Sequence, residues 1–169
     1  MNERIADRLI EAGIPLDRRA LAQAAGRLLA DEAPLAGPGV VTEVVDGLVG
    51  LGPIEELLRD PTVSDVLVNQ FDDIWVERAG RLEPTTVQFA SPEAVTAAVE
   101  RVIAPLGLRL DRASPAVDAR LPDGSRLHAI VPPISIDGPA MAVRRFTDAV
   151  PTLDALVSSG AVRPEGAEF

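Results

Sequence analysis

The sequence predicts an α+β protein in which an N-terminal helical extension precedes an antiparallel sheet domain with one covering helix. Apolar residues recur at helical spacing in residues 1–49, whereas residues 64–87 alternate apolar and polar side chains. In the second part, strand patterns outnumber helical ones, and one long helical pattern is available to cover a sheet face. Gly50-Leu51-Gly52-Pro53 separates the two patterns. We therefore predict a helical extension at 1–49 and a sheet domain at 50–169.

Three short helices are expected in the extension. The first carries an apolar stripe that ends at Gly13 and Pro15, the second begins at the capping residue Asp17, and the third covers Val40–Val49. These apolar stripes are too narrow to build a large core. The extension is therefore expected either to pack on itself or to dock onto a partner.

The sheet domain places short strands around one long helix. Ser91, Pro92 and Glu93 begin this helix, because a capping hydroxyl, a first-turn proline and a first-turn acid favour a helix N-terminus, and Pro105 ends it. The other expected elements are a helix at 54–58, strands at 64–69, 74–78, 81–87 and 139–146, a hairpin at 117–129 and a closing helix at 152–157.

The hairpin is predicted from the turn Leu121-Pro122-Asp123-Gly124, since proline, aspartate and glycine suit successive positions of a type I turn with a bulge. If Leu121 lies opposite Ser125, Arg120 faces Arg126. Asp118 then faces His128 on the same side. The last two resemble a base and its orienting carboxylate, but no serine or cysteine nucleophile carries a matching signature. The pair is expected to stabilise the hairpin.

Two arginines directly opposite each other repel unless an anion lies between them. Arg144 and Arg145 end the next apolar run, so four arginines come together in this part of the sequence. Arginine presents a planar fork of donors to phosphate or carboxylate and keeps its charge at neutral pH. One interpretation is a cluster that receives a phosphate-like anion. The other is an ordinary solvated strand face, which nearby aspartates neutralise, namely Asp118, Asp123 and Asp137.

Composition excludes several classes of function. The net charge of −10 argues against nucleic acid as a partner, although residues 101–145 carry seven arginines and four aspartates. The absence of cysteine and the single histidine exclude thiolate and multi-histidine metal sites within one chain. The chain also lacks lysine, so it has no Walker A loop. It shows neither a membrane-spanning apolar run nor a signal-peptide pattern, which indicates a cytoplasmic protein.

Several motifs occur in a defined order from Gly50 onward. They are GLGPIE at 50–55, DPTVSDVLVN at 60–69, VDARLPDGSR at 117–126, IVPP at 130–133 and AVRRF at 142–146. Together they resemble the N-terminal domain of the CpaF/TadA-type ATPases that assemble Flp/Tad pili, within the type II/type IV secretion ATPase superfamily. Residues 1–49 lie outside this resemblance.

The resemblance implies a PAS-like domain of a homohexameric motor that lies over the nucleotide of a RecA-like ATPase domain. Arg120, Arg126 and Arg144 match the motif positions that contact the ATP phosphates, and Arg145 stands beside them where the family often has lysine. ATP and Mg²⁺ are implied as cofactors of the full-length protein. The chain by itself is expected to bind neither stably, to hold no metal and to have no catalytic residue of its own.

The leading hypothesis is therefore a regulatory, nucleotide-sensing and oligomerisation domain of an ATPase that powers Flp/Tad pilus assembly or secretion. Its implied partners are its own ATPase domain, neighbouring subunits and an inner-membrane platform protein, at the cytoplasmic side of the inner membrane. Two alternatives remain open. One is an interaction module that docks the motor onto the platform protein and has only structural arginines. The other is a small-molecule sensor with an internal apolar pocket.

Overall fold

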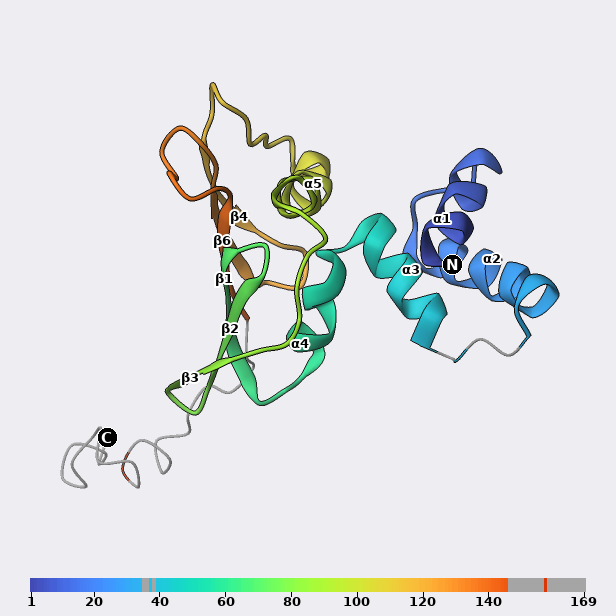
Figure 1. The fold of residues 1–169 in the computed structure, drawn as a ribbon, viewed down its shortest axis with the longest axis horizontal. Helices are drawn as coiled ribbons and strands as arrows, with labels where there is room; N and C mark the ends of the chain where they lie inside the picture. Colours follow the sequence, from blue (N-terminus) through green and yellow to red (C-terminus); the bar gives the residue numbers. More distant parts are fainter. Residues whose placement is uncertain (35–36, 38, 146–156, 158–169) are drawn as a thin grey trace, which may run out of the picture.

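The protein, in a computed structural model, has a helical segment followed by a sheet with helices on one of its faces (Figure 1). The structure describes residues 1–34, 37, 39–145 and 157. The predicted α+β class is confirmed, as is the order of a helical extension before an antiparallel sheet. Within the described part, no helix is both long and apolar enough to span a membrane.

The extension consists of α1 (Asn2–Glu11), α2 (Arg18–Glu32) and α3 (Gly39–Val49). Asp17 caps α2 as predicted, because its carboxylate accepts a hydrogen bond from the backbone N–H of Ala20 at 2.9 Å. The three helices bury one apolar cluster of their own, formed by Ile5, Leu9, Leu21, Ala25, Leu29, Val44 and Val45. The extension therefore packs on itself, which is one of the two expectations from the sequence.

The sheet has six strands, and every neighbouring pair is antiparallel. The strands are β1 (Val63–Gln70), β2 (Asp73–Arg78), β3 (Arg81–Pro84), β4 (Ala116–Arg120), β5 (Arg126–Ile130) and β6 (Ala140–Arg144). Their order in the sheet is β3-β2-β1-β6-β5-β4. β6, the last strand of the described residues, thus lies between β1 and β5 and joins a three-stranded meander to a hairpin.

Two helices cover one face of this sheet, α4 (Glu55–Arg59) and α5 (Pro92–Ile103), and short 3₁₀ turns lie at Gly52–Ile54 and Ala104–Leu106. The predicted cap of α5 is present, since the Ser91 hydroxyl accepts from the Ala94 N–H at 3.3 Å. The inward side chains form a second core, which includes Ile54, Val66, Val68, Ile74, Val76, Val95, Val99, Ile103, Leu127 and Val143. No described helix covers the opposite face, which we call the open face.

Two expectations for the sheet domain differ from the structure or fall outside it. The third strand ends at Pro84 instead of continuing to Val87. Pro84 has no backbone N–H to donate to the ladder, and after it the Thr85 N–H makes one further hydrogen bond to β2, to the Ile74 carbonyl at 2.9 Å. The predicted helix at 152–157 and the last residue of the predicted strand at 139–146 lie outside the described residues, apart from residue 157.

A buried carboxylate connects the extension to the sheet domain. Asp46 of α3 accepts hydrogen bonds from Arg18 at 2.7 Å and from Arg59 of α4 at 2.5 Å. Gly50 lies so close to this network that a Cβ atom there would stand 2.2 Å from the Glu55 carboxylate. Although the two segments have separate cores, their joint is therefore closely packed. That residues 1–49 form an independent domain stays a prediction.

A second polar network holds the end of β6 against the start of β1. The Arg145 guanidinium donates to the carbonyl oxygens of Asp60 at 2.6 Å and Val63 at 2.7 Å, and its backbone N–H donates to Ser64 at 2.9 Å. The Asp60 carboxylate accepts from the Thr62 N–H at 2.9 Å, from the Thr62 hydroxyl at 2.6 Å and from Arg78 at 3.0 Å. The link between α4 and β1 therefore fixes the position at which β6 ends.

This network makes one contribution to stability that depends on pH. Hydrogen bonds from Thr62, followed by that from Arg78, lower the pKa of Asp60 from 3.8 to about 2. A carboxylate with a lowered folded pKa stabilises the protein above its unfolded pKa, and this stabilisation is lost as the pH falls through the folded pKa. We expect Asp60→Asn to lower the unfolding temperature at neutral pH. The difference from the wild type should shrink between pH 3.8 and about 2.

Thermal unfolding across this pH range, followed by circular dichroism, measures the effect. Asp31→Asn is a suitable control, because Asp31 is exposed and has no hydrogen bond or ion pair among the described residues. A difference between wild type and Asp60→Asn that stays constant down to about pH 2 would contradict the assignment.

Arg144 and Arg145 are neighbours in sequence, but we expect their substitution to affect stability differently. Arg145→Ala removes the donor to two carbonyl groups and should cost about 1–3 kcal/mol in the free energy of unfolding. Arg144→Ala removes no hydrogen bond that the structure shows and should stay within about 0.5 kcal/mol of the wild type. Urea denaturation compares the two, and equal losses would show that Arg145 is not an anchor.

Candidate functional site

The predicted hairpin is confirmed in its register. Arg120 of β4 pairs with Arg126 of β5, and Asp118 pairs with His128. The turn closes through the Leu121 N–H, which donates to the Ser125 carbonyl at 2.8 Å. Gly124 has a φ of +88°, a conformation that side chains with a Cβ atom rarely adopt, which explains glycine at this turn position.

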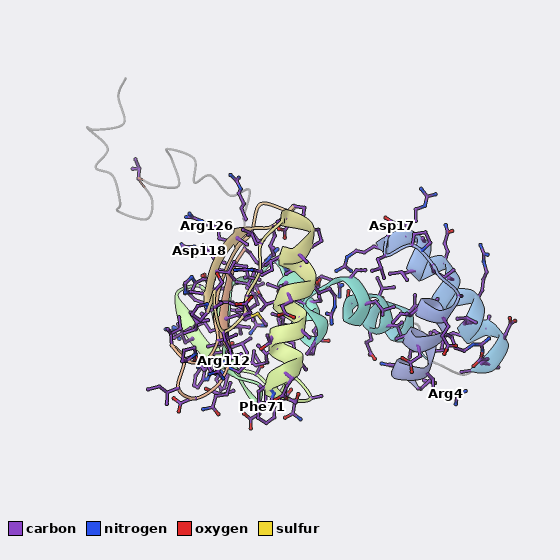
Figure 2. All side chains as sticks on the ribbon, turned by 90° about the horizontal axis from the view of Figure 1, so that it is seen from above. Arg4, Asp17, Phe71, Arg112, Asp118 and Arg126 are labelled. Carbon is purple, nitrogen blue, oxygen red and sulfur yellow. The ribbon has the colours of Figure 1, made fainter. Side chains whose placement is uncertain are left out.

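The neighbouring strand β6 adds a third arginine to this pair. Arg126 lies opposite Arg144 in the β5–β6 register, so that Arg120, Arg126 and Arg144 occupy one line across three adjacent strands. All three side chains are exposed. We call these three residues the arginine row. The row lies on the open face, and Figure 2 shows Arg126 and Asp118 on the side of the sheet away from α5.

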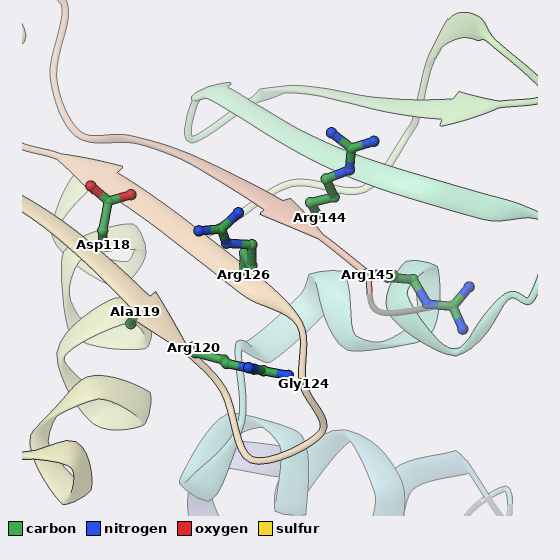
Figure 3. A pocket seen from close by; sticks show the side chains of 7 residues that line it. All are labelled: Asp118, Ala119, Arg120, Gly124, Arg126, Arg144 and Arg145. Atoms are coloured by element: carbon green, nitrogen blue, oxygen red, sulfur yellow. The ribbon is translucent and has the colours of Figure 1, made fainter. Parts of the chain in front are cut away.

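The arginine row lines an open hollow of about 780 Å³ (Figure 3). The other residues that line the hollow are Asp118, Ala119, Gly124 and Arg145. The lining therefore comes from β4, β5 and β6, from the hairpin turn and from the residue after β6. The hollow is large enough to receive a ligand of nucleotide or polyphosphate size.

The arginine row has no internal counterion in the described part of the chain. The Asp118 carboxylate accepts from Nδ1 of His128 at 2.9 Å, and the two oxygens of Asp123 accept from the N–H and the hydroxyl of Ser125 at 3.0 and 2.8 Å. No described acidic residue lies within ion-pair distance of any guanidinium of the row. The interpretation that nearby aspartates neutralise these arginines therefore lacks the contacts that it requires.

Arg145 differs from the three residues of the row, although the sequence placed all four arginines together. Its guanidinium points away from theirs in Figure 3 and is occupied by the two backbone carbonyls at the start of β1. Arg145 follows the last residue of β6 and borders the hollow, but these two carbonyls take up its guanidinium. Its partners are 82–85 residues away in the sequence, so the sequence alone could not identify them.

The chemistry available here is electrostatic recognition of an anion. Each guanidinium offers five N–H donors in a rigid fork and remains charged at neutral pH, and three of them line one hollow. A group of three or more side chains that could hold a metal ion is absent from the described residues. The arrangement can therefore orient and neutralise a phosphate-like group, and it contains no nucleophile positioned for covalent catalysis.

The line of paired residues that holds the arginine row continues across the rest of the sheet. Asp65 of β1 lies opposite Arg144, and Glu77 of β2 lies opposite Asp65. One line across the open face thus carries three positive residues on β4, β5 and β6 and two negative residues on β1 and β2. Each half repels ions of its own sign, so an anion that approaches this face is directed toward the arginine row.

This chain is similar to known proteins both in sequence and in fold. A Mycobacterium tuberculosis protein named for a role in conjugal transfer is 35% identical over 126 residues, which are 71% of this chain and 36% of that protein. A Methanocaldococcus jannaschii protein of uncharacterised function is 29% identical over 124 residues, covering 72% of this chain and 22% of its own length. The chain thus spans about a third or less of these relatives.

Among solved structures, the VirB11 ATPase of the Brucella suis type IV secretion system, in complex with sulphate, aligns with a TM-score of 0.58. Its sequence identity is 22%, and the alignment covers 66% of this chain and 34% of VirB11, so this likeness is one of fold. Residues 48–166 match the family described as "Type II/IV secretion system protein". The match takes in the whole sheet and leaves out nearly all of the extension. The chain therefore belongs to the Type II/IV secretion system protein family.

Proposed function

We propose that this chain is the N-terminal regulatory, nucleotide-sensing and oligomerisation domain of a homohexameric ATPase that powers Flp/Tad pilus assembly or secretion. In this proposal the arginine row contacts the phosphates of ATP, which a RecA-like domain binds together with Mg²⁺. Its partners are that domain, the neighbouring subunits and an inner-membrane platform protein. The domain works in the cytoplasm at the inner membrane.

The observation that carries the proposal is the arginine row without a counterion. Two positive charges about 4 Å apart repel by about 1 kcal/mol in water and by about 4 kcal/mol where the effective dielectric constant is near 20. The exposed sheet tolerates the smaller repulsion. If another domain covered the hollow, the larger repulsion would oppose closure unless an anion entered with it. The row therefore favours closure of the hollow when a phosphate is bound in it.

The composition agrees with a role in which phosphate binding is shared between domains. The chain has no lysine and therefore no Walker A loop, so the residues that hold the β-phosphate and Mg²⁺ would come from the RecA-like domain. The arginine row would act on the γ-phosphate region, where charge develops as the bond to the leaving group loosens. A guanidinium supplied from a second domain can meet this charge and then withdraw.

The second candidate function, docking onto a membrane platform protein, is favoured by a different observation. Ile10 and Leu16 of the helical extension are 59% and 69% exposed, and both are large apolar side chains. In this alternative the extension binds the partner and the arginines are structural. Hydrogen exchange of the ATPase with a nonhydrolysable ATP analogue separates the two: protection of the hairpin supports the first function, and protection confined to residues 1–49 by the platform protein supports the second.

Substitution in the arginine row tests the proposed function directly. In the intact ATPase, Arg→Ala at Arg120, Arg126 or Arg144 should reduce ATP turnover by at least about 100-fold. Arginine fingers raise the turnover of other phosphoryl-transfer enzymes by a factor of about 10³–10⁵, and the remaining arginines of the row should compensate for part of the loss. Nucleotide affinity should fall much less. Arg→Lys should restore little activity, since a point charge does not reproduce the bidentate fork.

The matched control is Arg112→Ala, which removes an exposed arginine outside the hollow (Figure 2) and should leave turnover unchanged. Turnover and thermal stability are measured on the same variants. Normal turnover with lowered stability would assign the row a structural role and refute the proposal.

The isolated chain should hydrolyse no ATP, because it lacks the phosphate-binding lysine of a Walker A loop. Release of inorganic phosphate from ATP with Mg²⁺ is the measurement, and the Arg126→Ala variant shows whether any background depends on the row. Metal-dependent turnover above that background would overturn this expectation.

A further inference from the structure

The loop between β5 and β6 exposes large apolar side chains. Ile134 is 55% exposed and Ile136 is 94% exposed, the highest value among the large hydrophobic residues that the structure describes. Asp137 follows them, is exposed and forms no hydrogen bond or ion pair with a described residue. The loop thus presents aliphatic side chains to solvent next to a carboxylate. We call residues 134–137 the isoleucine loop.

A groove of about 440 Å³ lies on another part of the domain, where the end of α3, α4, the end of α5 and the β4–β5 turn meet. Its walls are largely apolar and include Leu51, Leu58, Val102, Pro105, Leu106 and Leu121. Leu106 is 39% exposed, so the apolar wall is open to solvent. The groove thus offers a surface that an aliphatic side chain can fill.

Arg101 is the cation of this groove that lacks a carboxylate partner. Its guanidinium donates to the carbonyl of Gly50 at 2.7 Å and makes no described ion pair. Burial lowers the pKa of Arg101, which reflects the loss of water around a charge that no acid compensates.

The other charges of the groove are already engaged. Arg18 and Arg59 both bind Asp46. The Glu55 carboxylate accepts from the backbone N–H of Leu51, and both oxygens of Asp123 are used by Ser125. Among the described cations of the groove, Arg101 is therefore the one without a carboxylate partner.

We propose that the isoleucine loop of one copy of this chain docks into the groove of a second copy, with Ile136 among the apolar walls and Asp137 paired to Arg101. The loop supplies an aliphatic side chain next to a carboxylate, and the groove supplies aliphatic walls next to an unpaired guanidinium. The isoleucine loop and the groove are therefore complementary in polarity and charge, and both belong to the same chain. A charged pair at the edge of an apolar contact fixes its register.

The two surfaces cannot meet within one molecule. The groove includes the turn that precedes β5, and the isoleucine loop follows β5. A strand of five residues holds its ends about 16 Å apart at about 3.3 Å per residue. Because the contact joins two different surfaces, it is head-to-tail, and repetition of such a contact generates a ring or a filament.

This inference rests on the oligomerisation part of the proposed function and names a contact for it. It involves neither nucleotide nor the arginine row, so its test can fail while the turnover test of the row succeeds. The chain contains no cysteine, so single cysteine variants report one contact each. Ile136→Cys and Leu106→Cys are mixed and oxidised mildly. A disulfide needs Cβ atoms within about 4.5 Å, so we expect the heterodimer to form at least about fivefold faster than with a control.

The control pair is Ile136→Cys with Ile10→Cys, because Ile10 is exposed but lies on α1, away from the groove. Asp137→Arg in the Ile136→Cys chain should reduce the rate to that of the control, whereas Asp137→Glu should retain most of it. Both changes lie on an exposed loop and leave the cores intact. Equal rates for the two pairs, or faster linkage of Ile136→Cys to itself, would overturn the inference.

Discussion

Repulsion among three guanidinium groups on adjacent strands is the constraint around which the open face is built. Arg120, Arg126 and Arg144 stand in one register because β6 pairs with β5 as well as with β1. In water the repulsion is small enough for the two cores to outweigh it. No described acidic side chain forms an ion pair with the row: Asp118 and Asp123 bind other groups, and Asp65 lies opposite Arg144 without pairing to it. The sheet thus holds the row in a state that an external anion would stabilise.

The position of the row depends on contacts made by residues other than its own three members. Arg145 fixes the end of β6 to the backbone at the start of β1, and Asp60 is held there by Thr62 and Arg78. A short strand between two others can slip by one residue, and such a slip would turn Arg144 toward the core. The anchor prevents this because its donor meets two carbonyls at once. Arg145 therefore fixes the end of β6, whereas its neighbour Arg144 presents a positive charge on the open face.

The remaining surfaces fit a domain that works within an assembly. The extension has its own core and joins the sheet through Asp46 and its two arginines, while the isoleucine loop and the groove lie at the two ends of β5. The hollow on the open face and the groove adjoin at the β4–β5 turn, whereas the isoleucine loop lies at the other end of β5.

Much of this protein is determined locally and could be predicted from the sequence. Caps at Asp17 and Ser91, the turn before Ser125 and the resulting Arg120–Arg126 pair all depend on residues within a few positions of one another. What only the tertiary structure decided depends on distant pairing. The insertion of β6 beside β5 brought Arg144 into the row, and contacts across more than 80 residues gave Arg145 its structural role. Local sequence patterns specify which face a side chain takes, but the partner across a sheet is chosen by the packing of the whole core.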